Sequence, residues 1–74
     1  MIKFEDFVKT LLPGCYTIEL YRWDIMKDPE LLLVIPKEYN WRMDRFFKPY
    51  LEWNFFEIRV EGNLIKLYIT EEAI

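Results

Sequence analysis

Few residues in this chain are equipped for catalytic chemistry. Cys15 is the only cysteine, and the sequence contains no histidine and no serine. A Ser–His–Asp triad, a Cys–His pair and a zinc site built on imidazole are therefore excluded. Cys15 follows Pro13-Gly14 at the expected start of a strand, where no helix dipole would activate its thiol, so we interpret it as a small structural side chain.

Carboxylates are the other candidates for catalysis, because paired acids can act as general acid and base. Glu19 and Glu57 are both expected on one face of a sheet, but Arg59 and Lys66 are available there as partners, which favours a solvated, charge-paired surface. The chain has only two glycines, too few for a glycine-rich phosphate loop, and no carboxylate spacing fits a calcium loop. We expect no catalytic residue, no cofactor and no metal.

Aromatic side chains remain, and they suggest two binding surfaces. The first is a sheet face carrying Tyr21, Trp23, Tyr68 and Phe55. Tyrosine and tryptophan are enriched at protein interfaces because they bury a large area at little cost in side-chain entropy. This surface predicts binding to another protein or to a second copy of the chain.

The second surface is the outward side of a helix, where Trp41, Arg42, Arg45 and Lys48 lie close together. They belong to the only stretch with net positive charge, residues 37–48. Such a cluster fits an acidic protein surface, or a base stacked on Trp41 with its phosphates held by the arginines. The structural alternative is a tryptophan packed at the helix start beneath Arg45.

Two helices are expected to position these surfaces. Apolar residues at helical spacing predict a helix over 2–12, ended by Pro13-Gly14. The same spacing predicts a second helix over 38–48, ended by Pro49, with Asn40 as an alternative N-cap. The two apolar stripes are Phe4, Phe7, Val8, Leu11 and Leu12, and Tyr39, Met43, Phe46, Phe47 and Tyr50.

Four strands are expected between and after the helices. Alternation over 15–23 places Tyr16, Ile18 and Leu20 toward the core; an apolar run follows at 31–35, and 24–30 is interpreted as a loop. Gly62-Asn63 predicts a type II′ hairpin turn between strands 55–61 and 64–70. Its register pairs Val60 with Ile65, Ile58 with Leu67 and Phe56 with Ile69 on one face, and Arg59 with Lys66 and Glu57 with Tyr68 on the other.

The expected fold is α+β in αββαββ order: a single domain over 1–74, with a four-stranded antiparallel sheet and both helices on one face. The other sheet face is then open, unless the 24–30 loop or the C-terminal tail covers it. The longest apolar run, residues 31–35, is far too short to cross a membrane. Acidic residues near the N-terminus and a lone cysteine favour a cytoplasmic protein.

Hydrophobic residues make up 53% of a 74-residue chain with a net charge of −3, so some large apolar side chains must lie at the surface. These features together predict a non-enzymatic protein-binding module, such as a small inhibitor or adaptor, or a self-associating subunit. Inhibitors encoded by phages and mobile elements share this size and composition. A nucleic-acid-contacting module using the Trp41, Arg42, Arg45 and Lys48 helix face is the alternative.

Overall fold

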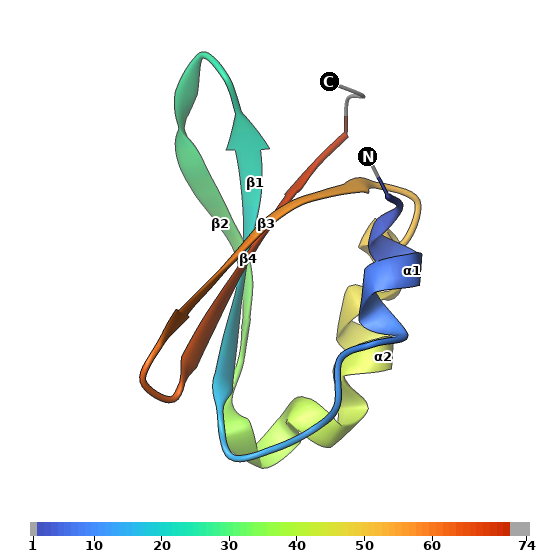
Figure 1. Cartoon of the computed structure of the whole chain (residues 1–74), viewed down its shortest axis with the longest axis vertical. Coiled ribbons are helices and arrows are strands. Elements are labelled where there is room, and N and C mark those ends of the chain that lie inside the picture. Colours follow the sequence, from blue (N-terminus) through green and yellow to red (C-terminus); the bar gives the residue numbers. More distant parts are fainter. Residues whose placement is uncertain (1, 72–74) are drawn as a thin grey trace.

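The computed structural model describes residues 2–71 of the chain. Strands β1 (Thr17–Asp24), β2 (Lys27–Ile35), β3 (Asn54–Glu61) and β4 (Leu64–Thr70) form a four-stranded sheet in the order β2-β1-β4-β3. Helix α1 (Phe4–Val8) and a second helical segment lie together on one side of this sheet (Figure 1). The α+β class and the placement of the helices on one face are therefore confirmed.

The sheet is mixed, so the prediction of an antiparallel sheet is correct for the two hairpins and wrong for the central strand pair. The two hairpins β1–β2 and β3–β4 are antiparallel, but β1 and β4 pair in parallel at the centre of the sheet. These two strands carry the fully buried side chains Ile18, Leu20, Leu67 and Ile69. Burial of these apolar residues favours the central positions for β1 and β4, and in this arrangement the two strands run in the same direction.

The first hairpin is longer than predicted, because residues 24–30 are not a loop. They form a tight turn and the first half of β2, and the Asp24 carboxylate accepts a hydrogen bond from the Met26 N–H at 2.9 Å. Pro29 is tolerated in this strand since β2 lies at the edge of the sheet. Ile25 and Met26 form an exposed tip of the hairpin, which extends away from the helices (Figure 1).

The second hairpin has the predicted register over most of its length. Val60 lies opposite Ile65 and Ile58 opposite Leu67, and Gly62 has a φ of 60°, as the first central residue of a type II′ turn requires. The exception is a β-bulge between Phe55 and Glu57. The bulge places Phe55, not Phe56, opposite Ile69, so the predicted pair of Phe56 with Ile69 is wrong.

Helix α1 is only five residues long, much shorter than the predicted 2–12. Ile2 and Lys3 are extended and pair with the start of β3: the Phe55 N–H donates to the Ile2 carbonyl at 2.9 Å. After the helix, the chain turns at Lys9 and Thr10 toward Pro13. The stripe is correct for Phe4, Phe7, Val8 and Leu11, which contact the core, but Leu12 is exposed.

The helix predicted at 38–48 is instead three short segments in succession. They are the 3₁₀ helix η1 (Lys37–Arg42), helix α2 (Met43–Phe47) and the 3₁₀ helix η2 (Lys48–Tyr50). A 3₁₀ helix has about three residues per turn, which shifts the apolar stripe out of phase with an α-helix. Met43 and Phe47 are consequently buried, whereas Tyr39 and Phe46 are exposed.

Asn40 joins η1 to the segment that leads into β1. Its side-chain amide donates to the Tyr16 carbonyl at 2.7 Å and to the Gly14 carbonyl at 2.5 Å, and the residue is 3% exposed. Asn40 is thus an internal link and not the N-cap that the sequence allowed. A Cβ at Gly14 would lie 2.9 Å from the Tyr16 ring, so a larger residue at this position would force the ring to move.

Candidate functional site

The sheet face opposite the helices, called the open face below, carries an aromatic pair at its centre. Tyr21 of β1 and Tyr68 of β4 are partners in the parallel register, and their rings stack with centroids 5.2 Å apart at 17°. Stacking buries Tyr68, which is 8% exposed, and leaves Tyr21 half-buried. Tyr21 and Tyr68 therefore lie on the face predicted for them, but much of their area is used within the fold.

A second aromatic pair extends across the open face. Trp23 of β1 stacks on Phe56 of β3, with ring centroids 4.2 Å apart at 20°, although β4 lies between their strands. Thr70 of β4 is 5% exposed at this end of the sheet. Trp23 lies where predicted, and Phe56 is a member of this surface that sequence reasoning missed.

Phe55 does not belong to the open face, so this predicted site residue is wrong. Its ring stacks on Phe7 of α1, with centroids 4.0 Å apart at 5°, on the helix side of the sheet. The bulge is the cause, because one additional residue exchanges the faces of Phe55 and Phe56 relative to a regular strand. The adjacent identical side chains left no signal in the sequence from which the exchange could be predicted.

Exposed aliphatic side chains flank the aromatic pairs on the edge strand β2. Leu31 is the register partner of Tyr21 and Val34 that of Glu19, so both lie on the open face, and they are 49% and 44% exposed. Leu32 and Leu33 contact the core instead, since a register shift at this point places two successive residues on that side. Leu31 and Val34 are the largest accessible apolar contribution of β2 to the open face.

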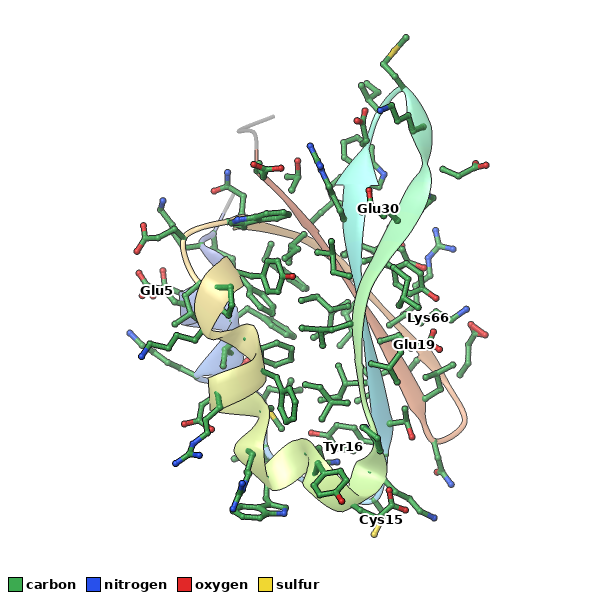
Figure 2. The ribbon with its side chains drawn as sticks, turned by 180° about the vertical axis from the view of Figure 1, so that it is seen from behind. Glu5, Cys15, Tyr16, Glu19, Glu30 and Lys66 are labelled. Atoms are coloured by element: carbon green, nitrogen blue, oxygen red, sulfur yellow. The ribbon has the colours of Figure 1, made fainter. Side chains whose placement is uncertain are left out.

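Charged residues occupy the other end of the open face and are paired among themselves. Lys66 contacts the Glu61 carboxylate at 3.0 Å, Arg59 donates to the Glu57 carboxylate, and Arg59 also lies over the Tyr68 ring, 5.4 Å from its centroid. Figure 2 shows Glu19 and Lys66 on the side of the sheet away from the helices. This end presents a solvated, charge-paired surface.

Glu19 and Glu57 do not form an acid–base pair. Glu19 accepts a hydrogen bond from the Tyr21 hydroxyl at 2.8 Å, whereas Glu57 is engaged with Arg59 on the far side of β4. The hydrogen bond to Glu19, reinforced by burial and by the carboxylate charge, raises the pKa of Tyr21 above its ordinary value. The carboxylate therefore stabilises a neutral tyrosine.

The predicted basic cluster lies on the helical layer, separate from the open face. Trp41 is 60% exposed, and its indole N–H donates to the Glu38 carbonyl at 3.1 Å. Arg42, and not Arg45, lies over the Trp41 ring, 4.4 Å from its centroid. Arg42, Arg45 and Lys48 are exposed, and within residues 2–71 none of them forms an ion pair with a carboxylate.

The remaining candidates have simple outcomes. Cys15 is exposed and unpaired with any other cysteine. The part of the chain that the structure describes contains no group of three or more acidic, cysteine or histidine side chains placed to hold a metal ion. Within residues 2–71 no helix has the length and apolar character needed to span a membrane.

Neither the 24–30 segment nor the tail is shown to cover the open face. Residues 24–30 belong to the β1–β2 hairpin, and Ile25 and Met26 at its tip are 77% and 84% exposed. Glu71, the last described residue, forms an ion pair with Arg22 of β1 at 2.9 Å. The rest of the predicted tail, residues 72–74, lies outside the described residues.

Comparison with known proteins gives no relative from which a role can be transferred. No protein-family model, no curated protein and no solved structure matches this chain.

Proposed function

We propose that this chain is a non-enzymatic protein-binding module whose open face docks a partner protein. The observation that carries the proposal is a sheet face on which Leu31, Val34, Trp23 and Phe56 are accessible, while both helical segments lie on the opposite side. A partner that covers such a surface removes apolar area from water, and a half-exposed leucine contributes about 1 kcal/mol in this way.

An inhibitor or adaptor is the role that fits these residues best. The stacked pairs Tyr21–Tyr68 and Trp23–Phe56 hold four rings in fixed positions before any partner arrives. Binding to a preorganised surface costs less conformational entropy than binding that must first order its side chains. The paired charges at the other end of the face supply a polar rim that restricts which partners fit.

The exposed aliphatic residues of β2 allow a test that leaves the stacked rings intact. The double variant Leu31→Lys with Val34→Lys places two charges on the open face, and we expect it to lose the proteins that the immobilised wild-type chain retains from a cell lysate. The matched control, Leu12→Lys, changes a leucine that is 75% exposed on the helical side, and it should retain the same proteins as the wild type.

Circular dichroism would verify that both variants keep the secondary structure of the wild type. The proposal fails if the wild-type chain retains no protein at all, or if the β2 double variant retains the same proteins with the same recovery. Equal losses in both variants would also contradict it, because the open face would then have no special role.

Nucleic-acid binding by the Trp41, Arg42, Arg45 and Lys48 surface is the second candidate. The absence of ion pairs at Arg42, Arg45 and Lys48 within residues 2–71 favours it, since these cations are free to contact phosphates. Oligonucleotide affinity should then fall steeply with salt and be lost in Arg42→Glu with Arg45→Glu. Affinity that is insensitive to both changes contradicts this candidate.

A further inference from the structure

The two edges of the sheet are strands β2 and β3, and they differ in how well they are protected. Strand β2 contains Pro29, which cannot donate a hydrogen bond, and its pairing with β1 is shifted at two places. Both features make an edge a poor template for another strand. Strand β3 has no proline, and its only shift in register lies between Phe55 and Glu57. Residues 57–61 of β3 are therefore a regular edge.

The N-terminal segment covers the start of β3 and shows where the free edge begins. The Phe4 N–H donates to the Trp53 carbonyl at 2.7 Å, the Phe55 N–H donates to the Ile2 carbonyl at 2.9 Å, and Lys3 forms an antiparallel bridge with Asn54. Among residues 2–71 no other segment pairs with the outer edge of β3. The stretch beyond the bulge is thus left open.

The register of the hairpin determines which backbone groups face outward from this edge. Glu61 and Leu64 close the two-residue turn, so they form a hydrogen-bonded pair. Because such pairs alternate along an antiparallel ladder, Arg59 and Glu57 also form hydrogen-bonded pairs with their partners in β4. The intervening residues Ile58 and Val60 direct their N–H and C=O groups away from β4. These four polar groups are available to another strand.

The side chains of this edge are divided by face. Ile58 and Val60 lie on the same face as the core but are left 40% and 64% exposed. Glu57, Arg59 and Glu61 lie on the open face, in a sequence of alternating charge. An edge with outward-directed backbone groups, an exposed apolar pair and alternating charge is suited to pairing with an identical strand.

We propose that a second copy of this chain pairs antiparallel with the β3 edge, about a twofold axis at Val60. In this register Val60 meets Val60 of the other copy, and Arg59 lies opposite Glu61 twice. The outward N–H and C=O groups of each Val60 bond to one another, and the two four-stranded sheets become one continuous sheet. The pairing uses the backbone of the β3 edge and the charges beside it, and none of the aromatic or aliphatic residues on which the proposed function rests, so the inference does not depend on that function.

Charge pairing and the position of the N-terminal segment favour a twofold axis at Val60 over axes at Arg59 or Ile58. An axis at Arg59 would oppose Arg59 with itself and Glu57 with Glu61, and opposed like charges are destabilising. An axis at Ile58 would pair Glu57 with Arg59 but would bring Glu61 of the other copy beside Phe55, whose outer edge Ile2 already occupies. The Val60 axis satisfies the charges and avoids the N-terminal segment.

The first test uses charge reversal in two separate variants. In Arg59→Glu the glutamate meets Glu61 of the other copy, and in Glu61→Arg the arginine meets Arg59, so each variant should dimerise at least about tenfold more weakly than the wild type. A mixture of the two variants restores opposite charges at both contacts. We expect light scattering and sedimentation to show dimers in the mixture that neither variant forms by itself.

The second test measures the register directly by crosslinking in a Cys15→Ala background, which removes the exposed native thiol. In Val60→Cys the two introduced residues are opposed at the axis, about 5.5 Å apart between Cα atoms, a distance that a disulfide spans. In the control Ile58→Cys the two cysteines are separated by roughly 13 Å along the paired strands, so no rapid crosslink is expected.

The wild-type dimer should be weak, with a dissociation constant on the order of 0.1 mM, because one strand per copy forms a small interface. A wild-type chain that stays monomeric at millimolar concentration overturns the inference. So do variants that dimerise as the wild type does, a mixture that fails to recover, or equal crosslinking of Ile58→Cys and Val60→Cys. Partner capture is tested by the Leu31 and Val34 variants, which do not change the β3 edge, so the two proposals fail separately.

Discussion

Asn40 is a polar side chain in the interior whose removal would leave two acceptors without a donor. We expect Asn40→Ala to lower the free energy of unfolding by roughly 1–3 kcal/mol, because the Gly14 and Tyr16 carbonyls lose their amide partner and Tyr16 is half-buried. Denaturant unfolding of the variant measures the loss. Asn63→Ala, at an exposed asparagine, is the matched control and should change the free energy by less than about 0.5 kcal/mol. Equal effects would contradict the role given to Asn40.

Tyr21 makes stability depend on pH in the alkaline range. The hydrogen bond to Glu19 raises the pKa of the folded Tyr21 above its ordinary value of 10.0, so its contribution is complete below pH 10.0 and is lost as pH rises through the folded pKa. Tyr21→Phe removes this contribution. We expect the stability difference between wild type and variant to shrink as pH is raised from about 8 to 11.

Denaturant unfolding at each pH gives this difference, and Tyr39→Phe at an exposed tyrosine is the control. The pKa of Tyr16 is raised by burial and the pKa of Lys66 by its bond to Glu61, so both contribute an alkaline loss of the same sign. The loss at Tyr16 is common to the wild type and to Tyr21→Phe and cancels in the difference, whereas Lys66 interacts with the charge of Tyr21 and belongs to the same alkaline response. A difference that stays constant with pH contradicts the prediction.

The bulge in β3 can be tested by comparing its two phenylalanines. Phe55 is stacked on Phe7 within the fold, whereas Phe56 is 36% exposed on the open face. We expect Phe55→Ala to cost about 3 kcal/mol of unfolding free energy and Phe56→Ala about 1 kcal/mol. A regular strand would reverse this order, since Phe56 would then face the core. Thermal or denaturant unfolding of both variants decides between the two arrangements.

The β3–β4 turn depends on the conformation of Gly62. Its φ of 60° is unfavourable for an L-amino acid, and a Cβ at this position would meet no atom within 4 Å, so backbone strain is the only cost of adding one. Gly62→Ala should lose about 1–2 kcal/mol of unfolding free energy. In a synthetic chain, D-alanine at position 62 prefers positive φ and should retain the full stability. Equal losses with both forms of alanine would contradict the assignment.

At the level of elements, the sequence predicts those helices and strands whose formation depends on residues close to them in the chain. Alternation and Gly62-Asn63 are local signals, and they correctly predict the two strands of the second hairpin and its register up to the bulge. Asp28-Pro29 indicates a loop, but an edge strand tolerates proline, so the start of β2 was missed. The division of the second helix into three segments could not be predicted. Apolar spacing at 3.6 residues indicates a helix but does not show where the chain changes to 3₁₀ geometry.

For the whole molecule, the α+β class could be predicted and the element order in part, but the pairing of β1 with β4 could not. These strands are far apart in the sequence, and no local pattern indicates which edge of the first hairpin pairs with which edge of the second. In the candidate site, too, local patterns could be predicted and effects of long-range pairing could not. Tyr21, Trp23 and Tyr68 lie on the predicted face, whereas the places of Phe55 and Phe56 depend on a bulge that pairing with β4 reveals.

The pairing of Lys3 with Asn54, and of Asn54 with Thr70, brings both ends of the described chain to the same end of the sheet. Two strand spacings, about 10 Å, separate Lys3 from Thr70, a gap that a few residues can bridge. A short peptide linker between residue 71 and residue 2 would therefore close the described part of the chain into a ring while keeping the strand pairing. Such a ring would resist exopeptidases and should melt at a higher temperature than the linear chain, since its unfolded state has less conformational freedom.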